Sequence, residues 1–341
     1  MGNGGWSASN YAANTQSKIS SGTSFGYTRQ TKASSAYDWK AHEDLDPKRL
    51  AGQGSPFVGQ AVRESRDSVD HPNSLPIVVG FDQTGSMGRV PTTTQTKLAG
   101  LFGLLLRQGY AEDPQVMIAA YGDAFTDRVP LQISQFESDN RIDENLDKLF
   151  LEGNGGGNGG ESMALLWYYL AFHTATDAWD KRKKKGYAFF VADEVTHEVL
   201  PQQVADLIGD GEPLTSDLSA KGLAKAVQEK WDVRILVIDN MSAKMQGSVK
   251  FYDNLFGKDH VLVVEDPDSV TETIALAIGA LEGNIDIDTD AEDDLRSSGS
   301  NEVAIRSAVN ATASLKGFVG NNVVVAGQLD LDLGQSGNGR I

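Results

Sequence analysis

Residues 76–88 read Pro-Ile-Val-Val-Gly-Phe-Asp-Gln-Thr-Gly-Ser-Met-Gly, an apolar run that passes directly into a turn rich in oxygen-bearing side chains. Residues 77–81 are nearly all apolar, as expected for a short strand that is buried on both faces of a parallel sheet. Asp82, Thr84 and Ser86 follow at alternate positions and supply a carboxylate and two hydroxyls. Small hard cations such as Mg²⁺ prefer such ligands, with retained water completing the shell. The stretch therefore predicts a buried strand that ends in a metal site.

The segment after this turn has the pattern of a helix. Apolar residues recur at positions i, i+3, i+4 and i+7 within residues 98–105, which predicts a helix over residues 96–109. Open α/β sheets bind their ligands at the carboxyl ends of strands, which is where this turn would lie. A structural interpretation stays open, because Asp, Thr, Ser and Gly are also ordinary turn and helix-cap residues.

The sequence Asp-x-Thr-Gly-Ser-Met after a hydrophobic strand resembles the first motif of the metal-ion-dependent adhesion site in von Willebrand factor A domains. The resemblance covers roughly residues 72–283. It implies a three-layer, doubly wound fold, in which a mostly parallel sheet carries helices on both faces. It also implies that Asp82, Thr84 and Ser86 bind Mg²⁺, with Mn²⁺ or Ca²⁺ as alternatives.

Two further motifs of that family can be compared with the chain. Residues 155–161 read Gly-Gly-Gly-Asn-Gly-Gly-Glu, where a bacterial-type branch of the family has Gly-Gly-Gly-Asp-x-Pro-Glu. The resemblance implies that this second loop contributes Asn158 or Glu161, with Ser162 as another option, although an amide oxygen is a weaker Mg²⁺ ligand than a carboxylate. The third motif is an Asp at the end of the next buried strand, which is Asp193 here. The predicted ligands are therefore Asp82, Thr84, Ser86, Asn158, Glu161 and Asp193.

Three more side chains fall near the same edge of the predicted sheet. His197 is either a hydrogen-bond donor to the surroundings of the metal, as in that branch of the family, or a plain loop histidine. Asp123 follows the strand at residues 116–121, and we expect it no closer than a neighbour of the ligands. Asp239 ends a later strand, has no counterpart in the family motifs and is interpreted as a turn residue.

Strands and helices alternate through residues 72–283, which predicts a mostly parallel sheet with helices on both faces. One further strand, over residues 128–133, is expected to pair antiparallel at an edge. The predicted parallel strands are 77–81, 116–121, 187–192, 233–238 and 261–264, and the predicted helices are 96–109, 161–180, 218–230 and 268–281.

The two ends differ from this core. Residues 1–71 are rich in Gly, Ser, Asn and Gln with scattered aromatic residues, which indicates an extended arm that packs on something. Residues 284–341 are predicted to be an acidic linker and a small C-terminal segment, with a helix over residues 302–315 and short strands at 323–325 and 329–333. We expect residues 72–283 to fold without these ends.

Composition excludes several functions. A formal charge of −17 argues against nucleic-acid binding, because a binding surface must neutralise phosphates with Lys and Arg. No stretch approaches the length of a membrane span, and the first thirty or so residues lack the apolar core of a signal peptide. We therefore expect a cytoplasmic protein, with a virion as the alternative. The absence of cysteine excludes thiolate metal sites. The basic run at residues 181–185 is expected at a helix C-terminus.

No catalytic constellation is evident, and the sequence favours an interaction module over an enzyme. In the adhesion-site family a partner's Asp or Glu carboxylate completes the metal shell, so binding depends on the cation. Bacterial members often act beside AAA+ ATPases or within larger assemblies, and we expect such a partner here. A structural component of a phage particle or sheath is the first alternative. The second is a nucleotide-binding enzyme, because Gly155-x-Gly157-x-x-Gly160 matches a dinucleotide fingerprint.

Overall fold

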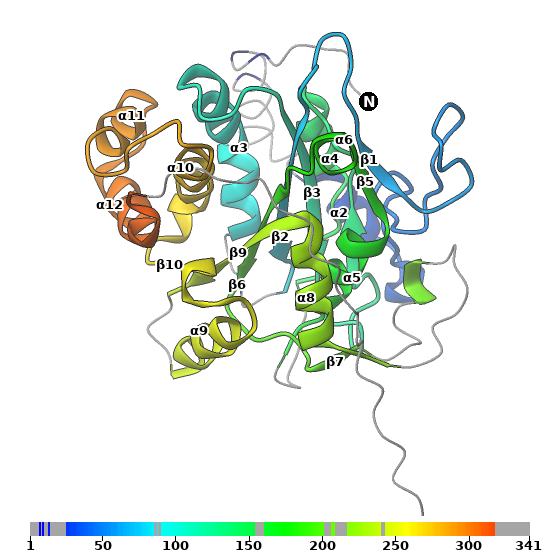
Figure 1. Ribbon diagram of the computed structural model, residues 1–341. Helices are drawn as coiled ribbons and strands as arrows, with labels where there is room; N and C mark the ends of the chain where they lie inside the picture. The colour runs from blue at the N-terminus through cyan, green and yellow to red at the C-terminus, as the bar shows by residue number, and fades with distance from the viewer. Residues whose placement is uncertain are drawn as a thin grey trace, which may run out of the picture.

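The structure is a computed structural model that describes residues 7, 9, 13, 25–84, 87, 90–153, 160–200, 206–208, 217–239 and 243–317. At its centre lies a six-stranded, mostly parallel sheet with helices on both faces (Figure 1). The predicted α/β, doubly wound architecture is confirmed. In the described part of the chain, no helix combines the length and apolar character that crossing a bilayer requires.

The five parallel strands begin at or slightly before the predicted positions, and the antiparallel edge strand begins at Leu131, three residues after its predicted start. The central strand is buried over its whole length, as its apolar sequence predicted. The edge strand, Leu131–Ile133, pairs antiparallel with its neighbour Pro114–Tyr121, which confirms the antiparallel edge pairing expected within residues 128–133. In spatial order the strands are β10 (Val261–Val264), β9 (Trp231–Ile238), β6 (Gly186–Ala192), β2 (Leu75–Asp82), β3 (Pro114–Tyr121) and β4 (Leu131–Ile133).

The two faces of the sheet belong to different core clusters. Alternate residues of β2 point to opposite faces, so Ile77, Val79 and Phe81 enter one cluster and Val78 enters the other. The first cluster is covered by α3 (Val90–Arg107), α4 (Arg141–Asp147) and α10 (Val270–Glu282), and the second by α5 (Met163–Phe172), α8 (Ala220–Lys230) and α9 (Ala243–Phe256).

The single helix predicted over residues 161–180 is wrong, because α5 ends at Phe172. The chain then forms β5 (Thr174–Thr176), which pairs parallel with the distant β1 (Arg63–Ser65). Two β-branched threonines in a run of three favour this strand over a continued helix. A short helix, α6 (Asp177–Arg182), follows and ends in the basic run, as expected.

The N-terminal arm is not extended in its described part. It contains α2 (Gly26–Lys32), the 3₁₀ turn η1 (Ala36–Asp38) and β1. Phe25 and Leu45 are buried in the first core cluster. The backbone N–H of Ile133 donates to the carbonyl of Leu45 at 2.8 Å, so the arm pairs with the outer edge of β4.

The C-terminal segment also packs on the sheet domain. Ile287 and Leu295 are buried in the same cluster as α10, although they lie in or next to the predicted acidic linker. The helix predicted over residues 302–315 is present, and the strands predicted at 323–325 and 329–333 lie outside the described residues. The elements here are α11 (Ala291–Ser297), α12 (Glu302–Ala311) and η6 (Ala313–Leu315). Figure 1 shows α11 and α12 on the side of α10. The division into arm, domain and C-terminal segment stays a prediction.

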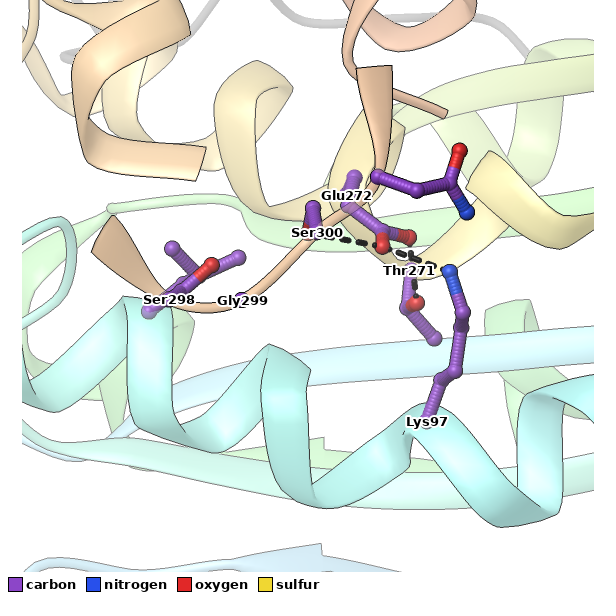
Figure 2. A pocket seen from close by; sticks show the side chains of 8 residues that line it. Lys97, Thr271, Glu272, Ser298, Gly299 and Ser300 are labelled. Carbon is purple, nitrogen blue, oxygen red and sulfur yellow. Dashed lines mark hydrogen bonds and ion pairs between the residues drawn. The ribbon is translucent and has the colours of Figure 1, made fainter. Parts of the chain in front are cut away.

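A cavity of about 270 Å³ lies where this segment meets α3 and α10 (Figure 2). Three side chains bond to the buried carboxylate of Glu272 there. Lys97 Nζ lies 2.6 Å from Oε1, Ser300 Oγ donates to Oε1 at 3.0 Å, and Thr271 Oγ1 donates to Oε2 at 2.8 Å. These bonds tie the loop between α11 and α12 to the helix that follows the first predicted metal motif.

The remaining short elements are β7 (Val199–Leu200), β8 (Leu218–Ser219), η3 (Asp206–Ile208), η4 (Lys258–His260) and η5 (Pro267–Ser269).

Gly186 provides a test of this packing. A Cβ atom there would lie 2.4 Å from the Trp231 ring and 2.8 Å from Pro76. We expect Gly186→Ala to destabilise the protein by about 1–3 kcal/mol, because overpacking forces neighbours off their rotamers. Gly247→Ala in α9 is the matched control, since nothing lies within 4 Å of its added Cβ, and it should be neutral or stabilising. Equal urea midpoints for the two variants would contradict this account.

Candidate metal site

Asp82 is the last residue of β2 and is held at the centre of the sheet between β3 and β6. Its carboxyl is almost fully buried, with 1% of the residue exposed. Oδ1 accepts a hydrogen bond from the backbone N–H of Thr84 at 2.6 Å. Oδ2 is buried and has no hydrogen-bond partner among the described residues. The turn thus presents one carboxylate oxygen that is fixed and one that is available.

Asp193 lies at the same end of the neighbouring strand. Phe81 of β2 is in register with Val191 of β6, so Asp82 and Asp193 both come at the carboxyl ends of adjacent parallel strands. Helix α9 supports this turn: Ser248 Oγ donates to the Asp193 carbonyl at 3.3 Å, and the Tyr252 hydroxyl donates to the Glu194 carbonyl at 2.9 Å. Asp193 therefore lies at the strand end where the sequence predicted it.

Glu161 reaches the same place from the segment before α5. Its backbone N–H donates to the carbonyl of Val195 at 3.0 Å, and its carbonyl accepts from the His197 N–H at 2.9 Å. The residue is buried, and its Oε2 likewise has no hydrogen-bond partner within the described chain. Two backbone bonds thus attach Glu161 to the loop that carries Asp193.

The electrostatics show that these carboxylates share one region. Burial, and then the charges of Asp193 and Glu194, raise the pKa of Asp82 to about 7. Burial, and then the charges of Asp82 and Asp127, raise the pKa of Glu161 to about 9. A bound cation would relieve both the desolvation and the repulsion.

The donor set fits a hard cation. It consists of carboxylate and hydroxyl oxygens, and two of the buried carboxylate oxygens have no hydrogen-bond partner in the described structure. The described residues contain no group of three or more His, Asp or Glu side chains that could hold a metal ion. A site here would therefore need neutral ligands such as Thr84.

A pH dependence of stability follows from the raised pKa values. A carboxyl whose folded pKa exceeds its unfolded value stabilises the fold fully below the unfolded pKa, and this contribution is lost as pH rises through the folded pKa. For Asp82 the window runs from its ordinary value, 3.8, to about 7. In EDTA we expect a higher Tm at pH 6 than at pH 8, by roughly 2–4 °C. Asp82→Asn should lack part of this gain in scanning calorimetry, because Glu161, whose pKa is raised to about 9, also contributes between pH 6 and pH 8. An undiminished gain would contradict the assignment.

Two of the predicted ligands cannot be placed, because Ser86 and Asn158 lie outside the described residues. Of the neighbouring residues, His197 bonds through Nε2 to Oδ1 of Asp123 at 3.0 Å. Asp123 is fully buried and also accepts from the Phe125 N–H at 3.0 Å. His197 is therefore bonded to the acidic surroundings of Glu161. The backbone N–H of Asp239 donates to the carbonyl of Val264 at 2.8 Å, which agrees with a turn residue.

Sequence reasoning missed two acidic residues of this region, Glu194 and Asp127. Both contribute to the raised pKa of Glu161, and the pKa of Asp127 is itself raised to about 6, chiefly by burial. A signal was present for Glu194, which directly follows Asp193 at a strand end. Asp127 gave only its spacing from Asp123, to whose backbone N–H it bonds at 2.8 Å.

The glycine loop does not have the context of a dinucleotide site in the described chain. That fingerprint must follow a strand directly. Residues 151–153, the last described before the loop, form no strand.

The sequence matches none of the known protein-family profiles and none of the curated protein sequences. Similar solved structures include the pilus adhesin SpaC from Lactobacillus rhamnosus GG, with a TM-score of 0.45 and 10% identity over 64% of this chain and 31% of that chain. They also include proximal thread matrix protein 1 from the mussel byssus, with a TM-score of 0.41 and 12% identity over 60% and 47%. A form of the mussel protein with a zinc-occupied MIDAS motif has a TM-score of 0.40 and 13% identity over 63% and 48%. This chain spans less than half the length of each.

Proposed function

We propose that this chain is a protein-interaction module of the von Willebrand factor A type, whose binding depends on a divalent cation at the carboxyl ends of β2 and β6. The observation that carries the proposal is the pair of buried carboxylate oxygens, Oδ2 of Asp82 and Oε2 of Glu161, that have no protein partner among the described residues. The charge of Asp82 raises the pKa of Glu161, and the charge of Asp193 raises that of Asp82. Mg²⁺ is the proposed ion, with Mn²⁺ and Ca²⁺ as alternatives, since all three prefer oxygen ligands.

Each side chain has a defined part in this proposal. Thr84 fixes Oδ1 of Asp82 through its backbone N–H, which leaves Oδ2 directed at the ion. Asp193 and Glu161 add negative charge, and Ser86 and Asn158 belong to the proposed ligand set on the sequence motifs. When bound, the cation supplies an open coordination position that the carboxylate of a partner's Asp or Glu can take.

The surroundings favour an acidic residue with apolar neighbours. Phe125 is 51% exposed and packs edge-on against His197, with 4.7 Å between ring centroids. Val199, the first residue of β7 and two positions after His197, is 48% exposed. The net charge of the chain repels an acidic partner at long range, but salt screens this beyond about 8 Å. Affinity would then come from the metal and these apolar contacts.

The setting we propose is a larger cytoplasmic assembly, with an AAA+ ATPase or an assembly subunit as the partner. A structural part in a phage particle or sheath is the alternative. We propose no enzymatic activity, and neither a nucleic acid nor a membrane as partner.

The test has two steps on the full chain. Calorimetry should first show Mg²⁺ binding at a single site. Partner proteins captured on the immobilised chain should then be released by EDTA and recovered when Mg²⁺ is added back, and Asp82→Asn should capture none of them. A partner that stays bound in EDTA and to Asp82→Asn would show that the interaction uses another surface.

A further inference from the structure

Two buried glutamines lie beside the proposed site. Gln83 directly follows Asp82, and Gln132 is the middle residue of β4; they are 2% and 0% exposed. Nε2 of Gln132 donates to Oε1 of Gln83 at 2.7 Å, and Nε2 of Gln83 donates to the carbonyl of Val129 at 2.5 Å. The first metal loop is thus joined by a side chain to the edge strand of the sheet.

The same Gln132 amide holds a second segment. It donates to the carbonyl of Phe150 at 2.8 Å and accepts from the Phe150 N–H at 2.8 Å. One side chain therefore provides the strand-like pair of bonds that Phe150 would otherwise make with a backbone. In the sequence, Phe150 lies shortly before the second predicted metal motif.

The N-terminal arm is hydrogen-bonded to the residues on either side of Phe150. The hydroxyl of Thr28 in α2 donates to the carbonyl of Leu149 at 2.7 Å and accepts from the N–H of Leu151 at 2.9 Å. Trp39 adds an aromatic contact to Phe150, with ring centroids 5.2 Å apart. A continuous series of hydrogen bonds and one short peptide segment thus leads from α2 to the residue next to Asp82.

We propose that Gln132 is a positioning residue that couples the first metal loop to the docked N-terminal arm through residues 149–151. The proposal rests on the proposed cation site. Without the Gln132 amide, Oε1 of Gln83 and both backbone groups of Phe150 lose their buried partner, and buried polar groups that lose a partner are driven toward other conformations. The loop that holds Asp82 relaxes, and cation affinity falls. By linkage, cation binding and arm docking stabilise each other.

Gln115 is a matched control. It lies at the amino end of β3, whereas the proposed metal site lies at the carboxyl ends of the parallel strands. Gln115 is 5% exposed and also makes two side-chain bonds, to Ser65 Oγ at 2.8 Å and to the Arg66 carbonyl at 3.0 Å. We expect Gln132→Leu to weaken Mg²⁺ binding by about tenfold or more in calorimetry, and Gln115→Leu to leave it unchanged even if the fold is destabilised. If the wild-type chain binds Mg²⁺ and Gln132→Leu binds equally well, the coupling is wrong. A wild-type chain without Mg²⁺ binding would instead refute the proposed function.

A second experiment needs no metal. Hydrogen exchange of the amides of Gln83 and Thr84 in EDTA should accelerate in Thr28→Val, which removes the hydroxyl but keeps the shape of the side chain. Thr28→Ser should restore the wild-type rate, because it retains the hydroxyl. Exchange at Gln83 and Thr84 that is equal in all three proteins, while Leu151 is deprotected by Thr28→Val, would overturn the link between the arm and the site.

Discussion

Asp82→Asn should weaken Mg²⁺ binding at least about 100-fold and leave the fold intact, since losing even an outer-shell partner typically costs about 10–100-fold. Asparagine retains an oxygen for the bond from the Thr84 N–H but lacks the charge that the second carboxylate oxygen shares. The metal-free variant should melt no lower than wild type, because it no longer buries a carboxylate whose pKa is raised to about 7.

Asp239→Asn is the control for this experiment. Asp239 follows β9 at the same carboxyl end of the sheet, so the variant removes one negative charge there and leaves every proposed ligand in the sequence. Its Mg²⁺ affinity should change by less than about threefold, as expected of screened charges. Equal losses in the two variants would mean that the site attracts cations only through its general charge.

A chain that ends at Gly283 should lose most of its stability. The truncation removes four large apolar side chains that are at most 3% exposed, those of Ile287, Leu295, Ile305 and Leu315. Each contributes about 1.5–3 kcal/mol, so the loss is about 6–12 kcal/mol. This is the same order as the whole free energy of unfolding of a typical domain, about 5–15 kcal/mol. We expect no cooperative melting transition by circular dichroism.

The matched chain for this test ends at residue 317, after the last described element. It keeps η6 and the bonds around Glu272, and should melt cooperatively and far above the chain that ends at Gly283. A cooperative transition near the wild-type Tm in the shorter chain would instead show that the fold does not need the C-terminal segment.

The core strands could be predicted because each is a short apolar run of the kind that parallel sheets bury. The wrong predictions arose where contacts between residues far apart in the sequence determine the local structure or the burial. Thr174–Thr176 continue an apolar helical pattern, and only pairing with Arg63–Ser65, over a hundred residues earlier, makes them a strand. Near residues 286–294 the density of Asp and Glu concealed Ile287 and Ala291, which are buried against the core.

The candidate site could be predicted in outline for a geometric reason. Parallel strands end at one edge, so Asp82 and Asp193 had to lie near each other, whatever the loops do. The support of that site could not be predicted. Gln83 and Gln132 have no sequence signal, because a glutamine is usually exposed and its partner is set by the packing of an edge strand. The same holds for Thr28, whose contacts lie over a hundred residues away.

The bond between Ile133 and Leu45 has a consequence for handling the protein. Strand β4 is an edge strand of the sheet, and an uncovered edge strand offers its unpaired backbone N–H and C=O groups to any other chain. In the intact protein the arm pairs with that position. If the N-terminal arm were removed, by design or by a protease, the outer edge of β4 would be exposed and would pair with other chains. The truncated protein would then self-associate. Light scattering would rise at high concentration while the circular dichroism spectrum stayed native.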